Sequence, residues 1–132
     1  MSKREIISTL NAPSATGPYS QAVRASGMLF ISGQIGIIPE NSRLAEGIEK
    51  QTKQTLENLK TILEAGGSSL ENVVKTTVFL KNMNNFNAMN EIYSSYFSVK
   101  FPARCCVEVS RLPKEAEIEI EAIALCKADI ED

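Results

Sequence analysis

The sequence predicts an α+β fold in which two helices cover one face of a mixed sheet of about six strands. Three observations lead to it: short β-rich segments at the start, two helical patterns separated by a buried strand, and two strands at the end. Elements in this order can form one sheet with helices on one side. The chain has 132 residues, 43% of them hydrophobic, which suits a single domain spanning residues 1–132.

The first third of the chain is expected to supply strands. Residues 5–7 can form a short strand, and a polar loop leads from it to the turn Gly17-Pro18-Tyr19. Residues 20–32 run apolar or alternate on both sides of Ser26-Gly27, which predicts a hairpin. Gly33 and Gly36 are expected to break or bulge the strand that follows.

Two helices are predicted further along the chain. Apolar side chains recur at helical spacing over residues 45–65, and Gly66-Gly67 ends the pattern. Residues 73–80 are rich in β-branched side chains and predict a buried strand. The second helix follows a capping cluster at residues 82–85. It places four large side chains on one face: Phe86, Met89, Tyr93 and Phe97.

Residues 101–113 and 117–125 predict two strands joined by a proline-bearing turn. Because alternate residues of a strand share a face, each strand carries one polar set. The first set is Arg104, Cys106 and Glu108, and the second is Glu117, Glu119 and Glu121.

The two polar sets would form a chemical site only if their strands pair in a suitable register. Pairing Cys106 with Glu119 would also bring Arg104 opposite Glu121, and the turn permits this register without requiring it. An arginine beside a carboxylate could then bind a small carboxylic acid and position or activate water. The alternative is a surface ion pair on a half-exposed strand, which alternating Glu and Ile residues also fit.

The last strand is apolar on both faces toward its end. One face carries Ile118, Ile120, Ala122 and Ala124. Ile123 and Leu125 share the other face with the glutamates, so both sides favour burial. Packing of sheets in a homo-oligomer would bury the second side, and a loop over Ile123 and Leu125 is the alternative.

The composition restricts the chemistry. With no histidine, a histidine base for a serine or cysteine nucleophile and cysteine/histidine zinc sites are excluded. No phosphate-binding loop occurs, and a net charge of −2 gives no sign of a nucleic-acid surface. Neither a membrane-spanning run nor an apolar signal core is expected. Cys105, Cys106 and Cys126 are expected to be reduced thiols of a cytoplasmic protein.

Three smaller clusters have ordinary structural explanations when each is taken alone. Tyr19 can simply pack against its turn. Ser32-Gly33-Gln34 could offer backbone N–H groups to an anion, although such a glycine more often marks a bulge. Asn90 lies near Tyr93 on the second predicted helix, where an isolated asparagine is usually exposed.

Together these clusters resemble one family. The chain resembles the Rid (YjgF) family, and within it the RidA type of reactive intermediate imine deaminases, over nearly its whole length. The resemblance rests on segments that occur in the family's order and spacing: Gly17-Pro-Tyr-Ser-Gln-Ala22, Ser32-Gly-Gln34, Val74-Lys-Thr-Thr-Val-Phe79, Asn90 with Tyr93, Phe101-Pro-Ala-Arg104, and Leu112-Pro with Ile118-Glu-Ile-Glu-Ala122.

The resemblance implies a fold, an assembly and a reaction. The fold is chorismate-mutase-like, and three copies pack their sheets into a barrel with active sites in clefts between subunits. The reaction is hydrolysis of enamine or imine intermediates, such as 2-aminoacrylate or 2-iminobutanoate, to 2-keto acids and ammonia. Pyridoxal-phosphate-dependent dehydratases release these intermediates, and the protein itself carries no cofactor or metal.

The resemblance also assigns roles to seven residues. It implies that Arg104 binds the substrate carboxylate and that Glu119 orients water and transfers protons. The remaining five border the substrate: Tyr19, Ser32, Gly33, Asn90 and Cys106.

Two other function classes compete with the deaminase. One is an RNA-directed role, as a ribonuclease or translation inhibitor, which the mildly acidic sequence and its few aromatic residues disfavour. The other is a binding or chaperone-like module that uses the clefts without turnover, against which Arg104 argues.

Overall fold

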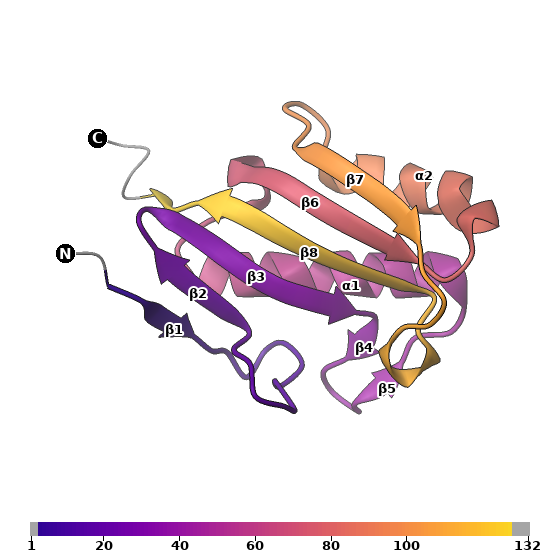
Figure 1. Cartoon of the computed structure of the whole chain (residues 1–132), viewed down its shortest axis with the longest axis horizontal. Helices are drawn as coiled ribbons and strands as arrows, with labels where there is room; N and C mark the ends of the chain where they lie inside the picture. The colour runs from indigo at the N-terminus through magenta and orange to yellow at the C-terminus, as the bar shows by residue number, and fades with distance from the viewer. Residues whose placement is uncertain (1–2, 128–132) are drawn as a thin grey trace.

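The computed structural model describes residues 3–127 of the chain. The predicted fraying of the tail at residues 129–132 lies outside the described residues. The α+β layout is confirmed: two helices pack on one face of a six-stranded mixed sheet (Figure 1).

The sheet order differs from the chain order at its centre. It runs β1 (Glu5–Ile7), β2 (Ala22–Ala25), β3 (Met28–Ile35), β8 (Ile118–Leu125), β6 (Val73–Leu80) and β7 (Ala103–Glu108). All neighbours are antiparallel except β6 and β7, which are parallel. A separate two-stranded ribbon consists of β4 (Ile37–Ile38) and β5 (Arg43–Leu44).

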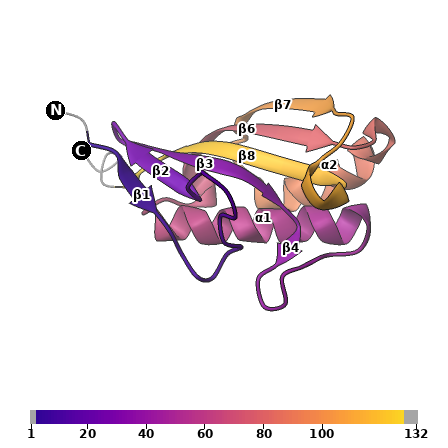
Figure 2. The same cartoon turned by 60° about the horizontal axis from the view of Figure 1, so that its bottom comes forward.

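Both helices, α1 (Gly47–Ala65) and α2 (Phe86–Tyr96), lie on the same side of the sheet (Figure 2). Short 3₁₀ turns occur at Leu70–Asn72, Met83–Asn85 and Pro113–Glu115. The predicted periodicity is confirmed, because α1 buries the apolar residues that recur at helical spacing: Leu56, Leu59, Ile62 and Leu63. α2 contributes Met89 and Tyr93 to the same core.

The predicted hairpin is confirmed between β2 and β3. Ser26 and Gly27 both adopt positive φ, 50° and 76°, which matches the right-handed twist of the flanking strands. The irregularity predicted at Gly33 is also present, because the register of β3 against β8 shifts between Ile31 and Gln34. The bulge lets β3 turn a side chain to the other face of the sheet.

The two strands predicted at residues 101–113 and 117–125 are present as β7 and β8, but the register that would pair Cys106 with Glu119 is wrong, because the two strands are not neighbours. β6 lies between β7 and β8, so Cys106 pairs with Val78 of β6 and Glu119 pairs with Phe79 of β6. The linker of residues 109–117 is longer than the usual hairpin loop of about 2–5 residues, and it crosses the end of β6 instead. The β-branched strand β6 thereby gains a hydrogen-bonded partner on each edge.

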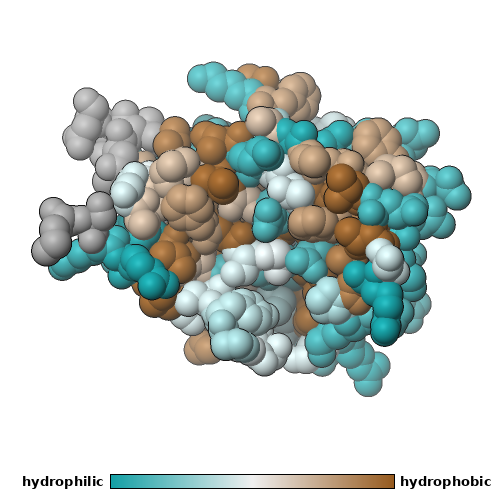
Figure 3. Space-filling model, in the orientation of Figure 1, coloured by the Kyte–Doolittle hydropathy of each residue, from teal (hydrophilic) through white to brown (hydrophobic). Residues whose placement is uncertain are grey.

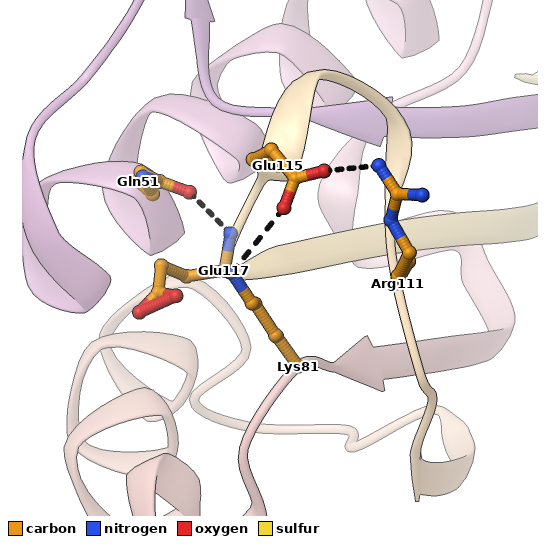
Figure 4. Close-up of polar contacts among 5 residues, drawn as sticks. All are labelled: Gln51, Lys81, Arg111, Glu115 and Glu117. Carbon is orange, nitrogen blue, oxygen red and sulfur yellow. Dashed lines mark hydrogen bonds and ion pairs between the residues drawn. The ribbon is translucent and has the colours of Figure 1, made fainter.

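Polar contacts hold this crossing linker in place (Figure 4). Arg111 donates to Glu115 at 2.6 Å, and Lys81 at the end of β6 lies 3.6 Å from the same carboxylate. The buried Oε1 of Gln51 on α1 accepts the backbone N–H of Glu117 at 2.8 Å. The start of β8 is therefore fixed from both sides, two residues before Glu119.

A second buried amide on α1 holds the segment that follows β3. Asn58 donates to the carbonyl oxygens of Ile35 and Ile37, at 3.1 and 2.9 Å. Gly36 lies between them and approaches α1 so closely that a Cβ there would be 2.8 Å from the Cα and the carbonyl oxygen of Gln51. Only glycine fits this contact without displacing the helix backbone.

No helix covers the opposite face of the sheet, and apolar patches lie among polar residues on it (Figure 3). One row of paired residues runs across it through Ile6, Val23, Phe30 and Ile123. Phe30 and Leu125 are 43% and 37% exposed, so nothing in the described chain buries them. Burial of one apolar side of the last strand is confirmed, because Ile118, Ile120, Ala122 and Ala124 are buried on the helix side, whereas Leu125 on the other side is exposed.

Within residues 3–127, neither helix is long and apolar enough to cross a membrane. Cys105, Cys106 and Cys126 form no disulfide among the described residues.

Gly36→Ala should destabilise the protein, because its Cβ would press on the backbone of α1. We expect the free energy of unfolding to fall by about 1–3 kcal/mol in a urea titration. Gly17→Ala is the matched control, since a Cβ there would make only ordinary contact with the Tyr19 ring at 3.4 Å. Equal stability of the two variants would contradict the close approach of Gly36 to α1.

Candidate functional site

Arg104 extends from β7 toward α2, on the helix side of the sheet. Its Nη1 donates to Oδ1 of Asn90 at 2.7 Å. Its Cζ lies over two aromatic rings, 5.5 Å from the centroid of Phe86 and 4.8 Å from that of Tyr93. These contacts leave several of the five guanidinium N–H groups available to a ligand. A hollow here is lined by residues of α2 and the 101–104 segment, including Glu91 and Phe101.

Cys106 lies two residues further along the same face of β7 and is half-buried against the core. Burial raises the pKa of its thiol, an effect that the positive charge of Arg104 partly offsets. The thiol is therefore protonated at neutral pH and is a poor nucleophile. Cys106 can line the space beside Arg104, but it is not suited to act as a nucleophile.

Glu119 lies on the open face of the sheet, in a row with apolar neighbours. It pairs with Ile35 of β3 on one side and with Phe79 of β6 on the other. Burial, and to a smaller extent the negative charge of Glu121, raise the pKa of Glu119. A carboxyl group whose pKa is raised toward neutrality can exchange protons with a substrate more readily than an ordinary one.

Gly33 provides the space that Glu119 occupies. A Cβ at position 33 would lie 2.0 Å from Oε2 of Glu119, so any other residue would displace the carboxylate. The bulge in β3 and the missing side chain of Gly33 together create a place for the acid. The sequence predicted the bulge, but it did not show that the bulge leaves space for Glu119.

Tyr19 and Ser32 lie around the same groove as Glu119 and Gly33. The backbone N–H of Tyr19 donates to the carbonyl of Gly17 at 2.8 Å, which confirms the predicted turn. Ser32 Oγ donates to the carbonyl of Ser20 at 2.6 Å. The buried Gln21 side chain ties the loop to β2 through Thr9 and Pro13. Tyr19 is 52% exposed, so its ring forms part of an open rim.

The predicted site residues thus fall into two groups that one chain does not bring together. Arg104, Asn90 and Cys106 lie on the helix side of β7. Tyr19, Ser32, Gly33 and Glu119 surround a groove on the other side of the sheet. Arg104 pairs with Thr76, and Thr76 pairs with the core residue Ala122, so Arg104 lies on the helix side. Glu119 shares the open face with Ile123. The register that would have placed Arg104 opposite Glu121 is therefore wrong.

The structure adds three residues that the sequence did not assign to the site. Phe86 and Tyr93 contact the guanidinium of Arg104, and Thr76 bonds to the Tyr93 hydroxyl at 2.8 Å. The helical spacing of Phe86, Asn90 and Tyr93 was visible in the sequence. The pattern predicts that Phe86 and Tyr93 pack into the core and that Asn90 is exposed, because packing and function share one pattern.

Each group has its own chemistry. The arginine group can bind a small carboxylate with paired N–H donors. The glutamate group can hold water and move a proton. Among residues 3–127, no three His, Cys, Asp or Glu side chains are placed to hold a metal ion.

Known proteins are similar to this chain over most of its length. A family model described as Endoribonuclease L-PSP matches residues 9–126. A RutC family protein of Pyrococcus horikoshii is 57% identical over 122 residues, 92% of this chain and 97% of that protein. The human 2-iminobutanoate/2-iminopropanoate deaminase is 50% identical over 123 residues, 92% of this chain and 90% of that enzyme.

The fold also matches a solved structure. A protein of unknown function from the conserved Rid family of Yersinia pestis has a TM-score of 0.91 and 50% sequence identity to this chain. The match covers 93% of this chain and 99% of that protein.

The raised pKa of Glu119 predicts how stability depends on pH. The folded protein binds this proton more tightly than the unfolded chain does. The stabilisation is therefore complete below the ordinary pKa of 4.5 and is lost as pH rises through the raised value. Denaturant titrations between about pH 4 and 8 should show Glu119→Gln gaining stability relative to wild type as pH increases.

Glu121→Gln is the matched control for this titration. It removes only the smaller of the two causes, so Glu119 should still titrate above its ordinary pKa in carboxyl ¹³C spectra. An ordinary pKa of Glu119 in the wild-type protein would contradict the burial of its carboxyl group.

Proposed function

The chain belongs to the Rid (YjgF) family, and we propose that it hydrolyses reactive 2-imino acids to 2-keto acids and ammonia. The substrates are enamine or imine intermediates of the 2-aminoacrylate and 2-iminobutanoate class. The observation that carries the proposal is Arg104, a pre-oriented guanidinium that suits a small carboxylate. The human relative that is named for this reaction supports the choice of substrate.

The reaction adds one water molecule across the C=N bond and then breaks the C–N bond. Arg104 holds the carboxylate and so fixes the neighbouring imine carbon. Ionised Glu119 accepts a proton as water attacks that carbon, and it returns the proton to the nitrogen, which gives a carbon that bears one hydroxyl and one amino group. Glu119 then carries the hydroxyl proton to the amino nitrogen. Ammonia leaves with the electrons of the C–N bond, and the hydroxyl oxygen forms the keto group. No covalent enzyme intermediate is needed, so the lack of histidine is no obstacle.

The site is completed by a second copy of the chain. Because Arg104 and Glu119 lie on opposite faces of one sheet, each substrate binds Arg104 of one copy and Glu119 of its neighbour. A trimer with the chorismate-mutase-like barrel arrangement satisfies this requirement by packing the open sheet faces together. The exposed Phe30, which is paired with Ile123 on this face, supports this packing, since no residue among 3–127 buries it.

The remaining site residues have supporting roles in this proposal. Tyr19, Ser32 and Gly33 border the bound substrate on the glutamate side, and Cys106 lines the arginine side.

The chain is one Rid-type domain over residues 1–132, acts in the cytoplasm, and serves pyridoxal-phosphate-dependent dehydratases that release imino acids. The reduced cysteines suit that compartment.

A role on RNA is less well supported, although the matching family model is described as an endoribonuclease. The net charge of −2 provides little attraction for a phosphate backbone. The guanidinium of Arg104 already contacts two rings and an amide in a hollow suited to a small anion.

Arg104→Ala should reduce imine hydrolysis at least about 100-fold, because the substrate carboxylate loses its charged partner. Arg104→Lys should also lose most activity, since a point charge cannot replace the planar fork. The measurement is a coupled assay with a threonine dehydratase that follows keto-acid release above the spontaneous rate. The exposed Arg43 provides controls, Arg43→Ala and Arg43→Lys, which should keep wild-type activity. Near-wild-type turnover by a folded Arg104 variant would refute this role.

Mixing two inactive variants tests whether the site is shared between copies. Arg104→Ala and Glu119→Gln chains, unfolded together and refolded as mixed trimers, should regain activity. In a random mixture about one quarter of the sites receive both intact groups from neighbouring copies. Each variant refolded alone is the control, and sedimentation should report a trimer. A mixture that stays inactive, although its chains have exchanged, would contradict the shared site.

A further inference from the structure

We propose that Phe86, Asn90 and Tyr93 are positioning residues for Arg104. In this arrangement, called here the α2 cradle, two rings and one amide fix the guanidinium before substrate arrives. The inference rests on the proposed function in one respect only, that Arg104 binds the carboxylate of an imino acid. It gives Asn90 a new role, because Asn90 then acts through Arg104 instead of contacting the substrate.

The cradle follows from helical geometry. Phe86, Asn90 and Tyr93 are separated by four and three residues, so their side chains lie along one stripe of α2. The stripe meets β7 where Arg104 extends from the sheet. The rings lie 5.5 and 4.8 Å from Cζ, and the Asn90 amide accepts one guanidinium N–H at 2.7 Å.

Tyr93 links the cradle rigidly to the sheet. It is 5% exposed, its ring centroid lies 4.7 Å from that of Phe97, and its hydroxyl bonds to Thr76 at 2.8 Å. Thr76 is the register partner of Arg104 on the neighbouring strand. The ring beneath the guanidinium is therefore anchored to the sheet at the same level as the arginine that it supports.

The consequence is a specific effect on binding. An arginine side chain in solution has many rotamers, and a ligand that bonds to it must restrict them. The aromatic faces attract the cation and hold its plane, and Asn90 fixes one end. The rotamers are restricted on folding, so less conformational freedom is lost when a planar carboxylate binds the remaining N–H groups. Loss of the cradle should weaken carboxylate binding more than it slows proton transfer at Glu119.

Titration calorimetry with 2-oxobutanoate measures carboxylate binding without turnover. We expect Tyr93→Leu to raise its dissociation constant about tenfold, and Phe86→Leu about threefold. In the coupled assay, KM should rise by similar factors while kcat changes by less than about threefold. The conservative variant Tyr93→Phe keeps the ring and should restore binding to within about threefold of wild type.

Tyr96 provides the matched control on the same helix. Its hydroxyl bonds to Glu57 at 2.6 Å, away from Arg104, so Tyr96→Leu loses a ring and a hydrogen bond without touching the cradle. It should bind 2-oxobutanoate like the wild-type protein. If Tyr93→Leu and Phe86→Leu fold and also bind like wild type, the cradle is refuted.

A spectroscopic measurement keeps the test independent of ligand and activity. The Nε–Hε signal of Arg104, identified by its loss in Arg104→Lys, should be shifted by the ring currents of Phe86 and Tyr93. Each leucine variant should move the signal toward that of an exposed arginine, and Tyr96→Leu should not. An unshifted wild-type signal overturns the cradle. Should the wild-type protein hydrolyse no imine yet show the shifted signal, the proposed function fails while the cradle stands.

Discussion

The position of β6 between β7 and β8 is the constraint on which the rest of the molecule depends. It separates Arg104 from Glu119 by a strand and, through the alternation of side chains, places them on opposite faces of the sheet. The proposed carboxylate-binding group and the proposed proton-transfer group of one chain therefore cannot meet. The proposed chemistry needs a second copy, and the apolar row on the open face provides a physical reason for that copy to associate.

The two halves of the site depend on different supports. On the helix side, aromatic rings and an amide from α2 contact a permanent cation, which costs little because Arg104 is only half-buried and lines an open hollow. On the open side, a carboxyl group sits in a row with Ile35 and Phe79, and desolvation raises its pKa. The contacts from α2 hold the positive charge of Arg104 in one place, whereas desolvation makes the negative charge of Glu119 easier to neutralise by protonation.

Buried amides on α1 connect the core to the second half of the site. Asn58 holds the carbonyls on both sides of Gly36, and Gln51 holds the backbone at Glu117. These contacts fix the segment after β3 and the start of β8, the two chain segments that flank Glu119. Because a buried amide without partners is costly, the side chains specify one register as well as stabilising it. The bulge at Ser32-Gly33 then leaves the space that the carboxylate fills.

The sequence by itself determined the helices, the hairpin at Ser26-Gly27, the bulge near Gly33 and the buried side of the last strand. All of these depend on local periodicity or on the conformational freedom of glycine. It also placed Arg104 and Glu119 on polar strand faces. The tertiary structure alone decided that β6 separates those strands, that Phe86 and Tyr93 support the arginine, and that Gly33 makes room for the acid. Strand order and register arise from contacts between residues far apart in the chain, which no local pattern encodes.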